Sequence, residues 1–192
     1  MLILLMALLL TSCWIPEKFN VNINVKDDGS SSFVYDGVIA FGPALEAATK
    51  GKLKERDEER LKKKIEKIKK DSNVKKVDYL GKGRYQVLIE KEIALGEHYN
   101  LMNFFKINSD KNGTITIKGA KINAKTEKEL NSIGAKVEGT INLSIEDGVK
   151  IINDNIDNKP KFFGLFGGYS WDITSKSKQP TMTLQTNPKD KK

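Results

Sequence analysis

Few residues in this chain of 192 could carry out chemistry, and none of them stands in a catalytic pattern. Cys13 is the only cysteine and His98 the only histidine. A catalytic histidine needs a partner that positions it, and a metal site needs several ligands. The run Asn153–Asn158 offers oxygen atoms to calcium, but it lacks the spacing and the downstream glutamate of an EF-hand loop. We therefore expect a non-catalytic protein with no metal and no cofactor.

The twelve residues before Cys13 are uncharged and mostly apolar. A membrane-spanning helix takes about 20 apolar residues, whereas this run extends only from Met1 to Leu10. Such a length is typical of the apolar region of a secretion signal. Two alternatives remain, a plain secretion signal and a signal that ends in a lipid anchor.

Leu10-Thr11-Ser12-Cys13 resembles the lipobox of bacterial lipoproteins, in which an aliphatic residue and two small residues precede a cysteine. The resemblance implies cleavage after residue 12 and acylation of Cys13. It also implies a lipid-anchored protein on the bacterial cell membrane or outer membrane, facing the extracytoplasmic side. A lone cysteine beside a chance apolar start is the competing interpretation. No Lys or Arg precedes Cys13, which departs from the pattern and favours a translation start upstream.

The bulk composition, with 39% hydrophobic and 30% charged residues, is that of a globular domain. The net charge of +8 is concentrated between Lys50 and Lys70, where eleven Lys/Arg face five Asp/Glu. An exported protein rarely meets nucleic acid, so we expect no nucleic-acid partner and an anionic membrane surface or wall polymer instead. The basic surface is assigned to Lys62, Lys63, Lys67 and Lys70.

Alternation of apolar and polar residues predicts strands along most of the chain. In residues 19–25, phenylalanine, valine and isoleucine alternate with asparagine, and Asp28-Gly29 then separates this run from residues 31–41. Asp-Gly between alternating runs is a strong hairpin signal because both central positions need a positive φ. Further hairpins are predicted at Gly81-Lys82-Gly83, Asn112-Gly113 and Asp147-Gly148.

Two helices are expected between the strands. Residues 52–70 are rich in helix formers and contain no Gly or Pro, which predicts one long basic helix. Its first half, with the sequence KERDEER, has no apolar face, so we expect it to project towards solvent or a partner. A short helix is predicted over 126–133, with Thr126 and Glu129 as a capping box and Gly134 beyond its end.

Together these elements predict an α+β fold: a mainly antiparallel sheet built of hairpins, with one long basic helix and one short helix. The expected organisation has four parts. They are a lipoprotein signal peptide (1–12), the lipidated cysteine with a short spacer (13–18), a single domain (19–186) and a disordered tail (187–192).

The stretch KFFGLFGGYSW is the most informative one after the leader, because its aromatic side chains are separated by glycines. One interpretation is a core hairpin whose glycines permit a bend. The other is an apolar loop that enters a membrane or lines a lipid pocket. Candidate lipid or membrane contacts are Phe162, Phe163, Leu165, Phe166, Tyr169 and Trp171.

The layout also resembles the LppM-type domain of bacterial envelope lipoproteins. The resemblance rests on a strand–DDG–strand start soon after the cysteine, a charged helix, and the closing residues GTINLSIEDGVKI and YSWDI. It implies an α+β fold and a role in binding lipid at the envelope. Our leading hypothesis is an envelope lipoprotein that binds a lipid or another amphipathic component. The alternative is an interaction or scaffolding subunit of an envelope protein complex, which would dock through KERDEER.

Overall fold

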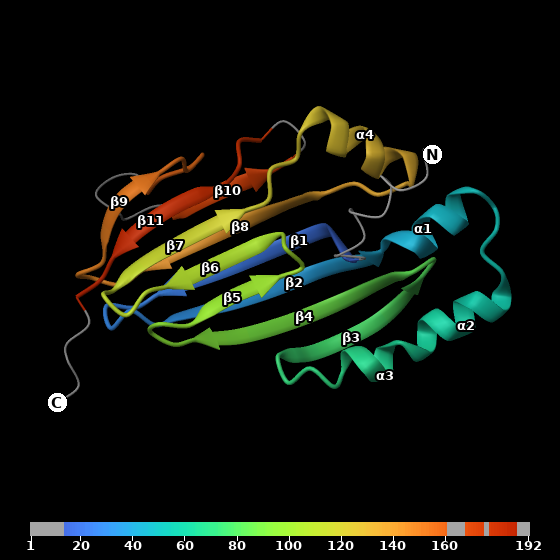
Figure 1. Cartoon of the computed structure of the whole chain (residues 1–192), viewed down its shortest axis with the longest axis horizontal. Helices are drawn as coiled ribbons and strands as arrows, with labels where there is room; N and C mark the ends of the chain where they lie inside the picture. The colour runs from blue at the N-terminus through green and yellow to red at the C-terminus, as the bar shows by residue number, and fades with distance from the viewer. Residues whose placement is uncertain (1–13, 161–167, 175–176, 188–192) are drawn as a thin grey trace, which may run out of the picture.

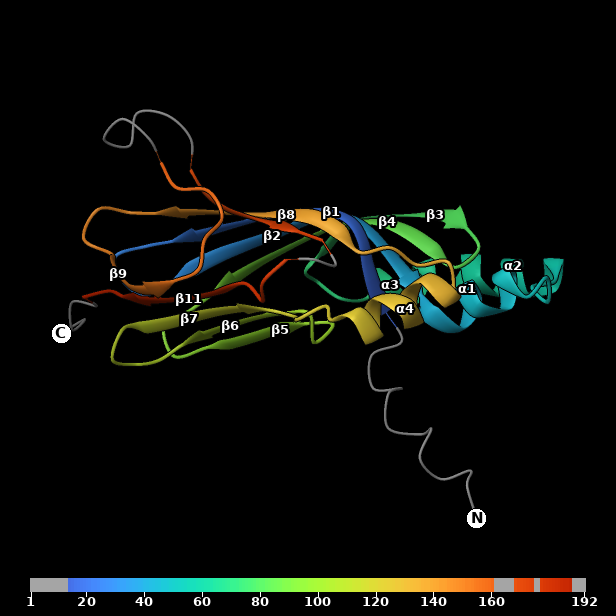
Figure 2. The same ribbon diagram turned by 90° about the horizontal axis from the view of Figure 1, so that it is seen from above.

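The computed structural model describes residues 14–160, 168–174 and 177–187. Two β-sheets lie face to face as two layers, and the helices gather at one end of the pair (Figures 1 and 2). Side chains from both sheets form one shared hydrophobic core. The described residues thus form a sandwich of two sheets with eleven strands and four short helices.

The first sheet has six strands in the order β10-β8-β1-β2-β4-β3. All its pairs are antiparallel except β1 with β8, which run parallel. Its strands are β1 (Trp14–Val25), β2 (Ser31–Phe41), β3 (Val74–Gly81), β4 (Arg84–Ile93), β8 (Glu138–Ile145) and β10 (Tyr169–Ile173).

The second sheet has five antiparallel strands in the order β5-β6-β7-β11-β9. Its outward side chains are mostly polar and its inward ones mostly apolar, and buried and exposed positions alternate along Phe105–Ser109. The strands are β5 (His98–Leu101), β6 (Phe105–Ser109), β7 (Thr114–Gly119), β9 (Lys150–Asp154) and β11 (Thr181–Gln185).

The helices α1 (Gly42–Thr49), α2 (Glu55–Lys63), α3 (Ile65–Ile68) and α4 (Ala124–Ser132) are all short. The α+β prediction with one long basic helix is therefore wrong, because β-structure dominates and residues 52–70 form two helices separated at Lys64. Contacts on either side of Lys64 explain the break: Glu58 is bonded to the β3–β4 turn, while Ile65 and Ile68 pack against the core. Helix α1 was not anticipated, although its proline in the first turn is a helix-start signal.

The predicted short helix is present as α4, but it begins two residues earlier than expected. Its N-cap is Asn123, whose side chain accepts a hydrogen bond from the Thr126 N–H at 2.9 Å, in place of a Thr126 capping box. Gly134 lies just past the end with φ 73°, as predicted for the C-terminal cap.

Three of the four predicted hairpins are confirmed: β1–β2, β3–β4 and β6–β7. The fourth is wrong, because Asp147-Gly148 connects the two sheets. Strand β8 pairs with β1 and β10 in the first sheet, whereas β9 pairs with β11 in the second. A turn sequence predicts a change of direction, but the apolar faces of the two strands decide which sheet each joins.

Strand β1 begins at Trp14, so it takes in residues 14–18, which the sequence analysis treated as a spacer. Within β1, the register shifts between Pro16 and Phe19. Phe19 then lies directly opposite a glycine on each neighbouring strand, Gly37 on β2 and Gly139 on β8. A Cβ at Gly139 would be 2.4 Å from the Phe19 carbonyl oxygen, so the glycines permit the close approach of Phe19.

A partly buried ion pair joins β1 and β4 and is bonded to the loop before β8. Arg84 donates from Nε to Glu17 Oε2 at 2.6 Å and from Nη2 to Oε1 at 3.1 Å. The same Nη2 also donates to the Gly134 carbonyl oxygen at 2.9 Å. The Glu17 side chain is 8% exposed, so its charge depends on this two-point contact for compensation.

We predict that Arg84→Ala lowers the free energy of unfolding by about 2–3 kcal/mol, because it leaves a carboxylate buried without its partner. Arg84 is 29% exposed, which keeps the cost below that of a fully buried pair. Urea unfolding measures the loss. The control is Lys91→Ala, which removes a half-exposed pair with Glu97 and should cost no more than about 1 kcal/mol. Equal losses for the two variants would contradict the prediction.

Gly139→Ala should cost about 1–3 kcal/mol, because the added methyl group overlaps the backbone and ring of Phe19. The matched control is Gly168→Ala, where an added Cβ meets no described atom within 4 Å. Thermal unfolding of both variants provides the measurement. A Gly139→Ala protein as stable as the Gly168→Ala protein would show that Phe19 can move away freely.

Candidate functional site

An apolar pocket of about 410 Å³ lies where the sandwich meets the helices. This volume falls within the range of about 300–1,000 Å³ found for small-molecule sites. The first sheet forms one wall, with Trp14, Ile39, Phe41, Val74 and Ile89. Ile68 of α3 and the β5–β6 turn residues Leu101 and Met102 form the others.

Three charged residues stand at the apolar pocket, two lysines and one aspartate. Lys64 places its ammonium group 3.7 Å from the ring centre of Phe41, a cation–π contact. Lys67 is exposed. The Asp71 carboxylate is already engaged, because its Oδ1 accepts from the Asn73 backbone N–H at 2.9 Å and side-chain amide at 2.8 Å. The two lysines therefore dominate the electrostatics of the pocket.

Trp14, the first residue that the structure describes, lies in the wall of this pocket. Its ring lies 5.5 Å from that of Phe41 and 5.4 Å from that of Tyr85. These contacts give β1 a defined direction from its first residue. Cys13, the residue predicted to carry the lipid, is adjacent in sequence and lies outside the described residues.

The turn at the rim of the pocket has an unusual backbone. Met102 and Asn103 are consecutive non-glycine residues with φ 54° and 55°, in the left-handed region that side chains disfavour. Asn100 stabilises the turn by accepting from the Asn103 backbone N–H at 3.0 Å and donating to the Asn103 side chain at 2.8 Å. Two consecutive positive φ values are what a tight hairpin turn requires, and the Phe104 N–H closes this turn by donating to the Leu101 carbonyl oxygen at 2.9 Å.

Helix α2 is fastened to the β3–β4 turn through Glu58. This carboxylate accepts hydrogen bonds from the Tyr79 hydroxyl and from the Lys82 backbone N–H at 3.0 Å. The Asp57 side chain is also engaged, since it accepts from the Lys54 backbone N–H at the helix start. Two of the acidic residues of KERDEER thus serve the fold, whereas the other five residues of the segment are exposed. Docking of a protein partner through this segment stays a prediction.

The predicted basic residues Lys62, Lys63, Lys67 and Lys70 are all exposed, on α2, α3 and the turn that follows. Among the described residues, none of the four has an ion-pair or hydrogen-bond partner. Two neighbouring basic residues, in contrast, have acidic partners: Lys69 pairs with Glu66 at 3.6 Å, and Arg60 approaches Asp57 at 4.0 Å. These four lysines, which we call the basic strip, therefore carry positive charge without a partner among the described residues, and Lys67 also lines the pocket.

The predicted aromatic contact surface is only partly described. Phe162, Phe163, Leu165 and Phe166 lie outside the described residues. Tyr169 is half-buried on β10. Trp171 is not a surface contact, because its side chain is 2% exposed in the core and its indole N–H donates to Asn155 Oδ1 at 3.0 Å. Strand alternation explains this, since Trp171 shares the inward face of β10 with Ile173.

The polar run before Pro160 is bonded internally. Asn155 accepts from Trp171 and from the Thr181 backbone N–H, and Asp157 accepts from the Asp172 N–H at 3.0 Å. The hydrogen bond from Lys159 lowers the pKa of Asp154. In the described part of the chain, no group of three or more His, Cys, Asp or Glu side chains could hold a metal ion. His98 lies exposed on β5.

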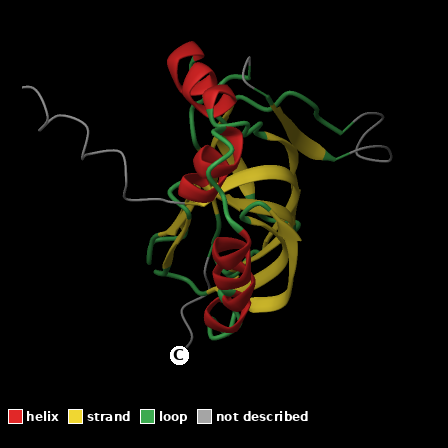
Figure 3. Ribbon diagram, turned by 90° about the vertical axis from the view of Figure 1, so that its right-hand side faces the viewer, coloured by secondary structure: helices red, strands yellow, loops and turns green. Residues whose placement is uncertain are grey.

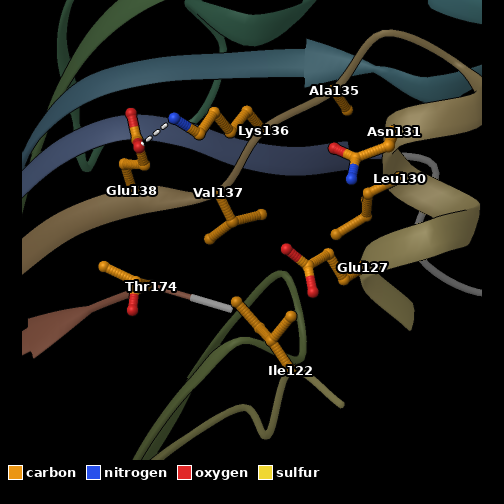
Figure 4. Close-up of a pocket in the computed structure, with 9 residues that line it drawn as sticks. All are labelled: Ile122, Glu127, Leu130, Asn131, Ala135, Lys136, Val137, Glu138 and Thr174. Atoms are coloured by element: carbon orange, nitrogen blue, oxygen red, sulfur yellow. Dashed lines mark ion pairs between the residues drawn. The ribbon is translucent and has the colours of Figure 1, made fainter. Parts of the chain in front are cut away.

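A smaller pocket of about 130 Å³ lies under α4 (Figure 4). Leu130 and Ile122 point into it, while Lys136 turns away to pair with Glu138. A third pocket, of about 360 Å³, contains the Arg84–Glu17 pair and Lys136 with Glu138. Each of these two pockets also has a charged lining residue without an ion-pair partner among the described residues, Glu127 under α4 and Lys18 in the third. The first pocket differs from both in its larger volume and in its aromatic lining residues Trp14 and Phe41.

The chain was compared with known proteins. No family model matches it, and no curated protein does. Among solved structures it is similar to the NMR structure of the folded domain of the Mycobacterium tuberculosis LppM protein. The identity is 13%, each chain is covered to 91%, and the TM-score is 0.37. The LppM-type resemblance thus has a weak structural counterpart, which carries no further argument. No helix in the described residues has the length and apolarity needed to cross a bilayer.

Burial raises the pKa of four tyrosines. It raises the pKa of Tyr79 to about 12, with the Glu58 hydrogen bond acting in the same direction. Burial also raises the pKa of Tyr99 to about 12, assisted by the charge of Asp71. The pKa values of Tyr35 and Tyr85 are raised further, again mainly by burial.

We therefore predict a loss of stability in alkali. An unfolded tyrosine releases its proton near about pH 10, whereas the folded protein retains these protons up to about pH 12. In this window the unfolded state binds fewer protons, so the free energy of unfolding falls as the pH rises. Urea unfolding at increasing pH, with tyrosinate absorbance, provides the measurement. Tyrosines that titrate near pH 10 with no loss of stability would contradict it.

Proposed function

We propose that this protein is a non-catalytic envelope lipoprotein that binds an amphipathic ligand, a lipid or similar component, in the apolar pocket. The observation that carries the proposal is the pocket itself. Its walls are aliphatic and aromatic, and its lysines Lys64 and Lys67 have no acidic partner in the described part of the chain. The apolar part of a ligand would replace water against Ile39, Ile68 and Leu101, and an anionic head group would meet the lysines.

Two further features support this choice of ligand. The ammonium group of Lys64 now lies on the Phe41 ring, a contact weaker than a charge-assisted hydrogen bond, so an anionic group can compete for it. The left-handed backbone at Met102 and Asn103 holds the rim of the pocket in a set shape, which reduces the ordering cost of binding.

The cellular part of the proposal rests on the leader and on Cys13. Acylated Cys13 would hold the protein on the extracytoplasmic side of the cell membrane or outer membrane. A leader that ends at the cysteine, in the pattern Leu10-Thr11-Ser12-Cys13, supports this.

The test uses residues 14–192, which contain every described helix and strand, with a dansyl-labelled fatty acid as the probe. We expect saturable fluorescence enhancement. Leu101→Trp should weaken binding by at least about tenfold, because the indole occupies the space of the acyl chain. The matched control is Leu130→Trp in the smaller pocket under α4, which should leave the affinity unchanged.

Native mass spectrometry of the same protein, purified from a bacterial host, adds a second measurement. A retained lipid that Leu101→Trp removes would support the proposal. A folded protein that binds neither the probe nor any host lipid would refute it. Equal weakening by Leu101→Trp and Leu130→Trp would refute the assignment to this pocket.

A further inference from the structure

We infer that the basic strip docks this domain onto an anionic lipid bilayer, with the helical end of the sandwich facing the membrane. This inference concerns a surface and not the interior of the pocket, so it stands whether or not a ligand fills the pocket. The partner is the head-group layer of a membrane that contains anionic phospholipid.

The first argument is the distribution of charge. Between Arg60 and Lys70 there are seven Lys/Arg and one Glu, a net charge of +6 in a chain whose total is +8. The single acid, Glu66, is paired with Lys69. The acids that precede this segment are partly withdrawn from the surface, because Glu58 is bonded to the β3–β4 turn and Asp57 to the helix start.

The second argument is that four exposed lysines without an ion-pair partner fall within one short segment, residues 62–70. Lys62, Lys63, Lys67 and Lys70 have no partner among the described residues, whereas Lys91, Lys136 and Lys159 each have an acid within 3.0 Å. A helix C-terminus favours nearby positive charge, which explains the presence of Lys62 and Lys63 in the last turn of α2. This explanation does not extend to Lys70, which lies beyond both helices.

The third argument is position. The helices gather at one end of the sandwich, and Figure 3 looks onto that end. Lys67 and Trp14 line the same pocket, so the chain enters the fold beside the basic strip. A lipid on Cys13 would therefore act at the same end of the domain as the strip. A tether raises the local concentration of the strip at the membrane, so that weak contacts suffice.

The experiment is vesicle co-sedimentation of residues 14–192, which lack the tether, with phosphatidylcholine vesicles that contain or lack phosphatidylglycerol. We expect binding only with phosphatidylglycerol, and weaker binding as salt is raised. A variant with Lys62, Lys63, Lys67 and Lys70 changed to Gln should lose at least about tenfold in affinity.

A second variant provides the matched control. It changes Lys106, Lys111, Lys118 and Lys150 to Gln, four exposed lysines on strands of the second sheet and on the β6–β7 turn. Its net charge therefore equals that of the basic-strip variant. We expect it to bind close to the wild-type level. Equal losses for the two variants would show that only net charge acts, and would overturn the inference, as would wild-type protein that binds neither vesicle. Urea unfolding of both variants verifies that they remain folded.

Leu101→Trp separates this inference from the proposed function. Its position in the pocket wall removes space for a ligand without changing any charge. If docking is correct and ligand binding is wrong, the wild type, Leu101→Trp and the control variant bind anionic vesicles, and the basic-strip variant does not. In that case none of these proteins binds the fatty acid. If ligand binding is correct and docking is wrong, the fatty acid binds to wild type and vesicles do not.

Discussion

The packing of Phe19 between the two sheets is the contact on which the rest of the structure depends. Its ring stacks on Tyr35 of the first sheet and meets Phe104 and Phe105 of the second edge-to-face. The glycines opposite Phe19 on β2 and β8 let the backbone and ring come close. Because Phe104 lies in the β5–β6 turn and Phe105 begins β6, this cluster also fixes where the turn lies. The shape of the pocket at the helical end is thus a consequence of aromatic packing in the core.

The same fold explains why positive charge is left on the surface beside the pocket. Attaching short helices to the end of a sandwich requires polar contacts, and the acids Glu58 and Asp57 supply them. Glu17 is used in the same way, to hold Arg84 between strands. Each acid taken into the structure leaves its lysine neighbours less compensated. The basic strip therefore arises from how the helices are fastened as well as from the composition of the segment.

Features that depend on local interactions were predictable from the sequence, whereas features that depend on distant contacts were not. The alternation in residues 19–25 and the glycine turns at 29, 83 and 113 predicted strands and hairpins correctly, because both are local. The parallel pairing of β1 with β8 joins residues about 120 apart, and no local pattern predicts it. The break at Lys64 also depends on distant contacts, since helix propensity in this segment is uniformly high. Exposed lysines were predictable because long charged side chains are seldom buried.

The apolar pocket was missed because its walls come from five separate segments: the start of β1, the end of β2, α3 with β3, the middle of β4, and the β5–β6 turn. Each of these looks like ordinary core in sequence. Their meeting point follows from strand order, which places β1, β2, β4 and β3 side by side. Trp14 belongs to strand β1, and its ring contacts with Phe41 and Tyr85 hold it in place. A membrane attachment at Cys13 would then place this end of the domain, with Trp14 in the wall of the pocket, next to the bilayer, which is where an amphipathic ligand would be exchanged.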